Sequence, residues 1–286
     1  MNPITPTKKA RGRPAADPDG KAGRGKAGKE HAANEESTLF VNSVEKAMRV
    51  LGVFNAKRRE LSMTQIASLA DLDMSAAQRF THTLGQLGLL RRDPATKLYE
   101  LSPRMLDFAY QFIGANELVG LATPFLQQLA AETEETVNLT LLDDTEIVFV
   151  QRFVSRHVLT PEVIVGTRLP AYCTSSGLAI LSALPEDEAR AVLSRSNRIT
   201  YTQYTQTDPD QIMERLARFR QQGYAHTEDE MYLGDIATAV AVLGADGRPR
   251  GAINVAVSRA RWHAPEDERR ISALLMAAGR AISSRG

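Results

Sequence analysis

The first candidates for chemistry are polar residues whose spacing places them on one face of a helix. They recur at intervals of three and four residues and are Ser75, Gln78, Arg79 and His82. A glutamine amide matches the N6 and N7 edge of adenine, and an arginine fork matches the O6 and N7 edge of guanine. The pattern therefore predicts a face that reads DNA bases. The alternative is an ordinary solvated helix face.

A second group of cations suits the DNA backbone rather than its bases. Arg91, Arg92 and Lys97 flank Asp93–Thr96, a turn between two short runs that are typical of a β-hairpin. Basic side chains on such a wing hold phosphates and thereby fix the position of a reading face. We therefore expect these three residues to contact phosphates.

The N-terminal tail carries a further basic motif. Lys8–Pro14 contains Arg-Gly-Arg-Pro and resembles an AT-hook. Its glycine lets the backbone approach the groove floor, and Arg11 and Arg13 would enter a narrow A·T minor groove of high negative potential. The alternative is a solvated basic tail with only non-specific attraction to phosphates.

A thiol and three hydroxyls gather at the expected start of a helix, in Cys173–Gly177. Thr174, Ser175 and Ser176 suit helix capping, and free N–H groups at a helix start bind carboxylates. A nucleophile would need a nearby base, and the segment lacks a serine with glycine two residues to either side. We expect a cap and an anion site here, and no catalytic residue.

Histidines and acidic residues are the types that could bind a metal. The candidates are His157, His226, His263, Glu228, Asp229 and Glu230. No two of these histidines are three or four residues apart, which is the spacing that helical metal ligands need. We therefore expect no metal and no cofactor, and we expect the acidic run to be solvated. Trp262 is expected in a core or an interface.

The elements that position the DNA-reading face follow from helix signals. Residues 43–55 carry an apolar helical stripe, Ser62 with Gln65 forms a capping-box pair, and Ser75 with Gln78 forms another. Phe80, Leu84 and Leu87 would face the core, and Gly88 would end the third helix. Three helices and a hairpin predict a winged helix-turn-helix over residues 40–103.

The rest of the chain predicts a linker helix and an α+β domain. Residues 104–116 carry the apolar stripe Leu106, Ala109, Tyr110 and Ile113 and form the linker. In residues 117–286 we expect a mostly antiparallel sheet and several helices. The expected strands are 137–142, 147–153, 158–165, 236–243 and 251–258, and the expected helices are 123–132, 178–193, 208–222 and one opened by Pro265.

Composition limits the class of protein. The 286 residues carry a net charge of +1 and one cysteine, and no run of eighteen apolar residues occurs. Charge is segregated: residues 1–30 hold eight Lys/Arg and three Asp/Glu, whereas residues 114–286 hold 17 and 22. The first third is therefore the expected polyanion binder, with residues 1–38 a disordered basic tail. No signal peptide is evident, so we expect a cytoplasmic protein without membrane partners.

Five segments together resemble the IclR family of bacterial transcription regulators. They are Val44–Leu51, Leu61–Ala67, Gly88–Asp93, Gly166–Gly177 and Gly223–Ala225. The resemblance implies a winged-helix DNA reader, a dimerising linker helix and a GAF-like effector domain. It also implies a homodimer or a dimer of dimers on a palindromic operator in double-stranded DNA.

The segment Arg168–Gly177 is similar to the branch that regulates aromatic-acid catabolism, and Asn254 points the same way. Ala237 and Ala256 stand where glyoxylate-type members hold polar effector contacts, which argues against glyoxylate or pyruvate. We therefore expect a small carboxylic-acid effector, either a hydroxylated aromatic acid or a ring-cleavage dicarboxylate such as β-ketoadipate. This chain departs from the family pattern in having Leu178 in place of a basic residue and Ala241 in place of proline.

The residues expected to bind this effector are Arg168, Tyr172, Thr174, Ser175, Ser176 and Asn254. Residues 114–286 have no lysine, so Arg168 would hold the carboxylate with its fork. The competing interpretation pairs Arg168 with an acidic residue of its own domain. The leading hypothesis is a regulator of a catabolic operon. The alternatives are a small-acid hydrolase with an accessory DNA-binding domain and an architectural DNA binder.

Overall fold

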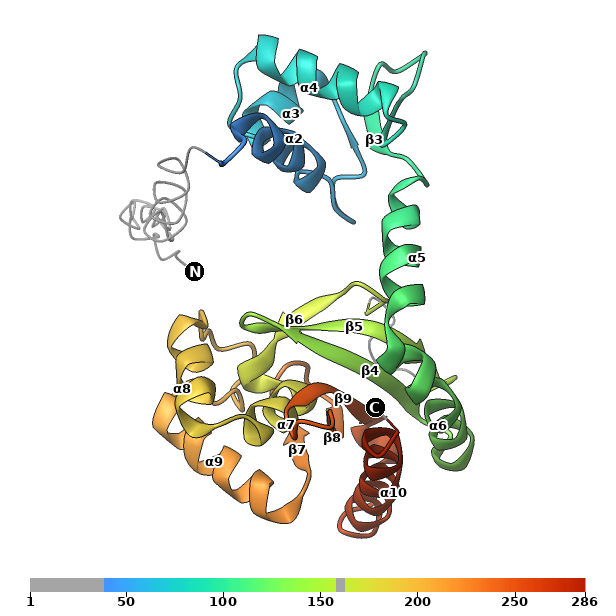
Figure 1. Cartoon of the computed structure of the whole chain (residues 1–286), viewed down its shortest axis with the longest axis vertical. Coiled ribbons are helices and arrows are strands. Elements are labelled where there is room, and N and C mark those ends of the chain that lie inside the picture. The colour runs from blue at the N-terminus through green and yellow to red at the C-terminus, as the bar shows by residue number, and fades with distance from the viewer. Residues whose placement is uncertain (1–38, 158–162, 286) are drawn as a thin grey trace, which may run out of the picture. The chain divides into compact units, whose positions relative to one another are not determined.

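The computed structural model describes residues 39–157 and 163–285 (Figure 1). The chain divides into two compact units, Met1–Met105 and Leu106–Gly286, and the division falls within the segment predicted as a linker helix. The AT-hook-like motif, with Arg11 and Arg13, lies outside the described residues.

The N-terminal unit is a winged helix-turn-helix. Its elements are α2 (Asn42–Gly52), β1 (Glu60–Leu61), α3 (Met63–Leu69), α4 (Met74–Gln86), β2 (Leu90–Arg92) and β3 (Tyr99–Leu101). The strands form an antiparallel sheet in the order β1-β3-β2, so the predicted hairpin is confirmed and gains a third, unpredicted strand.

Helix ends in this unit test the capping predictions. The capping box of α3 is present, with Ser62 Oγ accepting from Gln65 N and Gln65 Oε1 accepting from Ser62 N. The Ser75 cap is wrong, because the N-cap of α4 lies two residues earlier, at Asp73, whose Oδ1 accepts from Ala76 N at 2.8 Å. The helix does end before Gly88, whose φ of 75° requires glycine.

The core of the N-terminal unit holds most of the predicted apolar positions. Leu51, Phe54 and Leu84 are buried, and Phe80 packs partly against them. Leu87 is 54% exposed, which contradicts its predicted place in the core. It is the C-terminal cap of α4, where the chain turns away from the helix face that packs inward.

The C-terminal unit contains an antiparallel sheet of six strands in the order β6-β5-β4-β9-β8-β7. The strands are β4 (Thr136–Asp143), β5 (Glu146–Phe153), β6 (Arg168–Pro170), β7 (Ala225–Glu228), β8 (Asp235–Leu243) and β9 (Pro249–Ser258). Of the predicted strand 158–165, residues 163–165 are not strand and residues 158–162 lie outside the described residues. Strand β6, which pairs with β5, was not predicted.

Helices cover both faces of this sheet. They are α6 (Glu117–Thr133), α7 (Ser175–Ala183), α8 (Glu186–Arg195), α9 (Pro209–Gln222) and α10 (Glu266–Ser283), with short 3-10 turns η1 (Ala171–Cys173) and η2 (Arg259–Arg261). Helix α5 (Met105–Ala115) precedes them and has no buried residue. Helices α6 and α10 bury their apolar residues on one face, and α7 to α9 bury theirs on the other (Figure 1). No helix in the described part of the chain is long and apolar enough to cross a membrane.

Two helix predictions in this unit are wrong. The helix expected to open at Pro124 begins instead at Glu117, after the cap Asn116, and carries the proline in its interior. The single helix expected over 178–193 is two helices. They are interrupted at Leu184, because the residue before a proline disfavours helical backbone.

Candidate functional site

A shallow groove in the N-terminal unit joins the predicted reading face to the wing. Ser75, Gln78, Arg79 and His82 are all exposed on α4. Three of them line the groove: Gln78, Arg79 and His82. Arg92 and Tyr99 of the wing form its other side. Amide, guanidinium and imidazole groups therefore lie together on one accessible surface.

The three wing cations occupy different places. The guanidinium of Arg92 lies over the Tyr99 ring, 5.3 Å from its centroid, and its Nε donates to Lys97 O. Arg91 points elsewhere and pairs with Glu100 at 2.9 Å. Lys97 is exposed at the hairpin turn, with a positive φ of 62°. The structure thus brings Arg92, but not Arg91, into the groove.

A second basic cluster in this unit was missed. Lys57, Arg58 and Arg59 are exposed on the turn before β1. The carboxamide oxygen of Asn55 accepts from the backbone N–H groups of Lys57 and Arg58, which orders the turn. The signal was available in the sequence as three consecutive cations.

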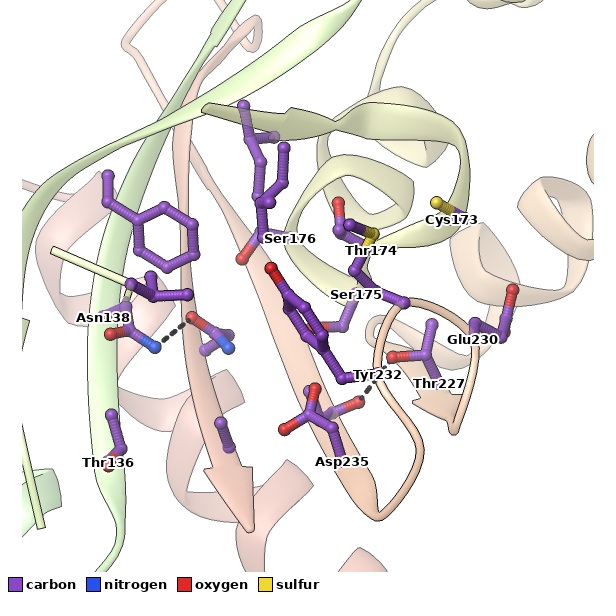
Figure 2. A pocket seen from close by; sticks show the side chains of 18 of the residues that line it. Thr136, Asn138, Cys173, Thr174, Ser175, Ser176, Thr227, Glu230, Tyr232 and Asp235 are labelled. Carbon is purple, nitrogen blue, oxygen red and sulfur yellow. Dashed lines mark hydrogen bonds between the residues drawn. The ribbon is translucent and has the colours of Figure 1, made fainter. Parts of the chain in front are cut away.

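The C-terminal unit contains a pocket between the sheet and the start of α7 (Figure 2). Apolar walls come from Ile147, Phe149, Val163, Leu169, Met231, Val257 and two alanines. The polar lining groups are Thr136, Asn138, Arg152, Thr174, Ser175, Ser176, Thr227, Glu230, Tyr232, Asp235, Asn254 and Ser258. Ala237 and Ala256, the two alanines, leave room for a ligand.

Strand register places three polar side chains in one row across the pocket wall. Asn138 of β4 pairs with Arg152 of β5 on one side and with Asn254 of β9 on the other. A β-bulge in β5, opposite Leu139 and Thr140, shifts the alternation of side chains between Phe149 and Arg152. Both Phe149 and Arg152 consequently line the pocket, although they are three residues apart.

The two asparagines of this row bond to each other. Asn138 Nδ2 donates to Asn254 Oδ1 at 3.1 Å, and both side chains are buried. Asn138 Oδ1 is also buried and has no hydrogen-bond partner. An acceptor in this state is unusual, because most buried polar atoms are paired.

The start of α7 faces the same pocket. A Cβ on Gly177 would come within 2.2 Å of Ala171 O, so only glycine lets α7 approach the preceding turn. The predicted hydroxyl cap is wrong, since Thr174 Oγ1 donates to Pro170 O at 2.8 Å and no side chain caps the helix. The first N–H groups of α7 therefore keep their capacity to bind an anion.

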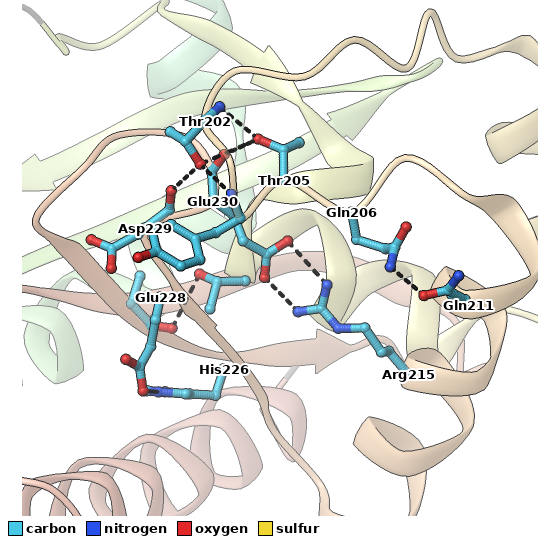
Figure 3. Close-up of polar contacts among 12 residues, drawn as sticks. Thr202, Thr205, Gln206, Gln211, Arg215, His226, Glu228, Asp229 and Glu230 are labelled. Atoms are coloured by element: carbon cyan, nitrogen blue, oxygen red, sulfur yellow. Dashed lines mark hydrogen bonds and ion pairs between the residues drawn. The ribbon is translucent and has the colours of Figure 1, made fainter.

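Of the acidic run predicted to be solvated, Glu228 is exposed, but Asp229 and Glu230 instead form a buried clamp (Figure 3). Glu230 is bound by both nitrogens of the Arg215 fork, at 3.0 and 2.5 Å. Asp229 pairs with Arg259 at 2.5 Å, and both acids are more than nine-tenths buried. Arginine partners are required because an unpaired buried carboxylate is costly.

The clamp holds the loop that closes one side of the pocket. Thr202 Oγ1 donates to Asp229 O and Thr205 Oγ1 donates to Glu230 O, each at 2.6 Å. The loop that follows presents Tyr232 to the pocket, between the strand wall and α7 (Figure 2). The position of this loop is therefore fixed by the threonine hydrogen bonds to its backbone and by the ion pairs of its two acids.

Two residues predicted to bind the effector lie outside the lining set. Arg168 projects from the edge strand β6 and pairs with Asp143 at 2.5 Å and Glu146 at 2.8 Å. The structure therefore agrees with the competing interpretation, in which Arg168 pairs with acidic residues of its own domain. Tyr172 is 1% exposed, and its hydroxyl bonds to both O and N of Ile199, which gives it a packing role. Thr174, Ser175, Ser176 and Asn254 do line the pocket.

The pocket contains two charged residues that sequence reasoning missed, Arg152 and Asp235. Burial raises the pKa of the Asp235 carboxyl to about 6; the charge of Arg152 opposes this, and that of Asp229 adds to it. Burial also lowers the pKa of Arg152, against the attraction of Asp235. The β-bulge explains why alternation along β5 did not reveal Arg152.

The thiol of Cys173 and the imidazole of His226 have packing roles. Burial raises the pKa of the Cys173 thiol to about 12, which makes it a poor nucleophile. His226 Nδ1 lies 3.0 Å from Thr238 Oγ1, and its ring stacks on Trp262, with centroids 5.3 Å apart. Across residues 39–157 and 163–285, no group of three His, Cys, Asp or Glu residues is arranged to hold a metal ion.

A winged helix-turn-helix unit and an α+β unit with a polar pocket are the parts expected of a DNA-binding transcription regulator. Residues 43–94 match the IclR helix-turn-helix domain, and residues 110–284 match the C-terminal domain of the bacterial transcriptional regulator IclR. The chain belongs to the IclR family. It is a transcription regulator, and the hydrolase alternative has no support.

Three similar proteins illustrate the relationship. The Pca regulon regulatory protein of Pseudomonas putida is 29% identical over 85% of this chain and 83% of its own. The p-hydroxybenzoate hydroxylase transcriptional activator of Acinetobacter baylyi is 32% identical over 78% and 84%. The crystal structure of a transcriptional regulator from Rhodococcus sp. RHA1 superposes with a TM-score of 0.76, at 28% identity, over 86% of this chain and 98% of that one.

Proposed function

We propose that this regulator binds a small aromatic carboxylic acid in the pocket beside α7, and that binding changes its affinity for operator DNA. The names of two relatives concern the pca regulon and p-hydroxybenzoate hydroxylase, which supports an effector from aromatic-acid metabolism. The observation that carries the proposal is the uncapped start of α7, which opens onto a pocket with apolar walls.

The pocket offers one place for a carboxylate and another for a ring. Ser175 and Ser176 are buried at the N-terminus of α7, where backbone N–H groups and the helix dipole favour an anion. Arg152 contributes positive charge from the opposite strand. Phe149 and Leu169 supply apolar contacts for a planar ring.

The charge of the lining favours a monocarboxylate over a dicarboxylate. Glu230 and Asp235 are acidic, and among the described lining residues Arg152 alone is cationic. The charge of Glu230 is already matched by Arg215. A second carboxylate such as that of β-ketoadipate would meet Asp235 without a further cation, at a cost in desolvation.

The DNA-binding part of the proposal uses the α4 groove. Ser75, Gln78, Arg79 and His82 would meet base edges in the major groove. Arg91, Arg92, Lys97 and the cluster Lys57–Arg59 would hold phosphates. Arg11 and Arg13 remain assigned to a minor-groove contact of the tail. The protein would act on chromosomal DNA in the cytoplasm.

A homodimer on a palindromic operator completes this proposal. Helix α5 exposes four large apolar side chains, more than a solvated helix of eleven residues needs: Leu106, Phe108, Tyr110 and Phe112. Leu106 and Tyr110 lie on one face of the helix and Phe108 and Phe112 on the opposite one, so a two-fold contact would remove one of these two faces from water. Sedimentation of the full chain tests the assembly, and a monomer at micromolar concentration would contradict it.

Calorimetric titration with 4-hydroxybenzoate, benzoate and β-ketoadipate tests the effector. We expect an aromatic acid to bind more tightly than the dicarboxylate. Arg152→Gln should weaken aromatic-acid binding roughly tenfold, because a charge-assisted contact of this kind contributes about 1.5–3 kcal/mol at most. Arg168→Gln is the matched control and should bind as the parent does. Loss of binding in Arg168→Gln alone would contradict the proposed site.

A further inference from the structure

The pocket beside α7 is too small, as it stands, for the acid proposed to bind there. Its cavity has a volume of about 60 Å³. An engineered apolar cavity of about 150 Å³ binds a single benzene ring, and pockets for small molecules usually measure about 300–1,000 Å³. An aromatic acid adds a carboxylate to such a ring. At least one lining side chain must therefore move before the acid can enter.

Much of the lining is held in the interior of the C-terminal unit. Phe149 is 6% exposed on β5, and its backbone N–H and carbonyl groups are both hydrogen-bonded. Ser175 and Ser176 are buried at the start of α7, which Gly177 allows to pack closely on the preceding turn. Moving any of these residues would disturb the sheet or the helix. The mobile element must therefore be sought on a loop.

Tyr232 is the one aromatic residue of the described lining that lies on a loop. Its ring points from this loop into the pocket, between the strand wall and α7 (Figure 2). The ring packs against the core of the unit, yet the residue remains partly exposed. The next residue, Leu233, is 64% exposed, so the tip of the loop borders solvent. The tyrosine ring thus fills part of the pocket from a place close to its edge.

The backbone of the loop is anchored on both sides of the tyrosine. Before it, Glu230 O accepts from a threonine hydroxyl at 2.6 Å. After it, Gly234 O accepts from Arg259 N at 2.8 Å, and Tyr232 O itself accepts from Asp235 N at 3.2 Å. Since the backbone is held at these points, the ring leaves the pocket by rotation about its own side-chain bonds, from one staggered rotamer to another.

We infer that Tyr232 is an internal occupant of the effector pocket, and that the acid binds by displacing its ring towards solvent. The ring of the acid and the ring of the tyrosine compete for the same apolar walls. This inference rests on the proposed aromatic-acid function and adds a step that the effector must drive. Because only molecules whose tyrosine ring lies outside the pocket can bind the acid, the apparent affinity is reduced in proportion to their fraction.

Removing the ring distinguishes displacement from the alternative, in which Tyr232 is a fixed wall that stacks on the bound acid. Calorimetry would compare the parent, Tyr232→Ala and Tyr232→Phe with benzoate and with 4-hydroxybenzoate. A minor conformation is typically populated at about 10% or less, so Tyr232→Ala should bind about tenfold more tightly than the parent, or better. Tyr232→Phe keeps the ring and should bind more weakly than Tyr232→Ala by a similar factor. An equal or weaker affinity in Tyr232→Ala than in the parent would overturn the inference.

Leu233→Ala is the matched control, because Leu233 is on the same loop and is not among the residues that line the pocket. This variant should bind both acids as the parent does. A gain in Leu233→Ala equal to that in Tyr232→Ala would trace the effect to the loop rather than to the ring, and displacement would then be wrong.

Fluorine NMR of the full chain labelled with fluorotyrosine measures the position of the ring directly. The resonance of Tyr232 is the one that is missing from the spectrum of Tyr232→Phe. We expect a saturating amount of the tighter-binding acid to move this resonance to the position of a solvent-exposed tyrosine. A resonance that keeps its buried position while the acid binds would contradict displacement.

The outcomes distinguish this inference from the proposed function. If neither acid binds the parent or Tyr232→Ala at millimolar concentration, the aromatic-acid function fails, and the inference fails with it. If both proteins bind and the alanine variant gains nothing, the function stands and displacement is wrong. Binding by the alanine variant alone supports both. A thermal unfolding curve identifies an alanine variant that has not folded, and the fluorine spectrum of the parent then decides alone.

Discussion

The two functional surfaces of this regulator are built in opposite ways. The groove on the N-terminal unit takes its residues from one helix and one hairpin, within residues 78–99, and leaves its polar groups exposed. The pocket of the C-terminal unit, proposed to bind the effector, takes its residues from strands, a helix start and a loop spread over residues 136–258. Most of its hydroxyl and amide groups are buried.

The difference agrees with the ligand proposed for each surface. A DNA-reading face needs free cations and donors that exchange water for bases and phosphates. A pocket for one small acid needs neutral polar groups that are held in place, and each buried carboxylate of the protein needs a cation as its partner. The Arg215–Glu230 pair is 17% and 7% exposed, whereas Arg91–Glu100 of the wing is 59% and 40% exposed.

The largest expected effect comes from breaking the buried pair of the pocket. Arg215→Ala leaves Glu230 buried without its partner and should lower the free energy of unfolding by about 3–5 kcal/mol. Arg91→Ala removes an exposed pair and should cost less than about 1 kcal/mol. Urea unfolding of both variants measures the contrast. Equal losses would show that the two regions do not differ in this respect.

A smaller effect is expected from the titration of Asp235. Its folded-state pKa of about 6 lies above the ordinary 3.8, so the folded protein binds this proton more readily than the unfolded chain does. The group therefore lowers stability as pH rises from about 4 through 6, by about 3 kcal/mol in total.

Asp235→Asn removes this titration. The variant should be more stable than the parent by a similar amount near pH 7.5, and the difference should shrink towards pH 4. Urea unfolding at several pH values gives the profile. A variant that is less stable at pH 7.5 would show that attraction to Arg152 outweighs the burial of the carboxyl.

Base readout by the exposed groove should depend on Gln78 and Arg79. Replacing either by alanine should weaken operator binding by about 1–3 kcal/mol and blur base preference at one position in each half-site. Binding selection from a random-sequence DNA library measures the preference. A uniform loss on all sequences would reassign that residue to phosphate contact.

The smallest effect is expected at the wing and the tail. Arg92→Ala should make the dependence of log affinity on log salt shallower by about 0.9, the loss of one phosphate contact. Deleting residues 1–38 should also make the salt dependence shallower, by a similar amount for each phosphate contact that is lost. Fluorescence anisotropy over a salt series measures each slope. An unchanged slope in Arg92→Ala would place its charge away from phosphates.

Local signals explain what the sequence could predict. The capping box of Ser62 and Gln65, the glycine after α9 and the hairpin between β8 and β9 each depend on a few neighbouring residues. The exposed face of α4 depends on helical spacing alone. These features were predicted because short-range geometry determines them.

The pocket was predicted less well because it depends on register between distant strands. Arg168 was chosen over Arg152 from its place near the α7 start. Yet β6 is an edge strand, and Arg168 lies within reach of Asp143 and Glu146. Arg152 reaches the pocket through a bulge that no local pattern marks. Asp235 is at the pocket because the β8 start lies beside the clamped loop.

The central claim is that an acid in this pocket controls DNA binding. The most direct test is the operator affinity of the parent and of Ala256→Phe, with and without a saturating amount of whichever benzoate or hydroxybenzoate binds most tightly. Ala256 lines the pocket, so phenylalanine would fill it without touching the α4 groove. We predict that the acid changes the parent's affinity at least fivefold, as a typical coupling free energy of about 1–3 kcal/mol implies, and leaves the affinity of a folded Ala256→Phe unchanged. An equal response in both proteins would contradict the account.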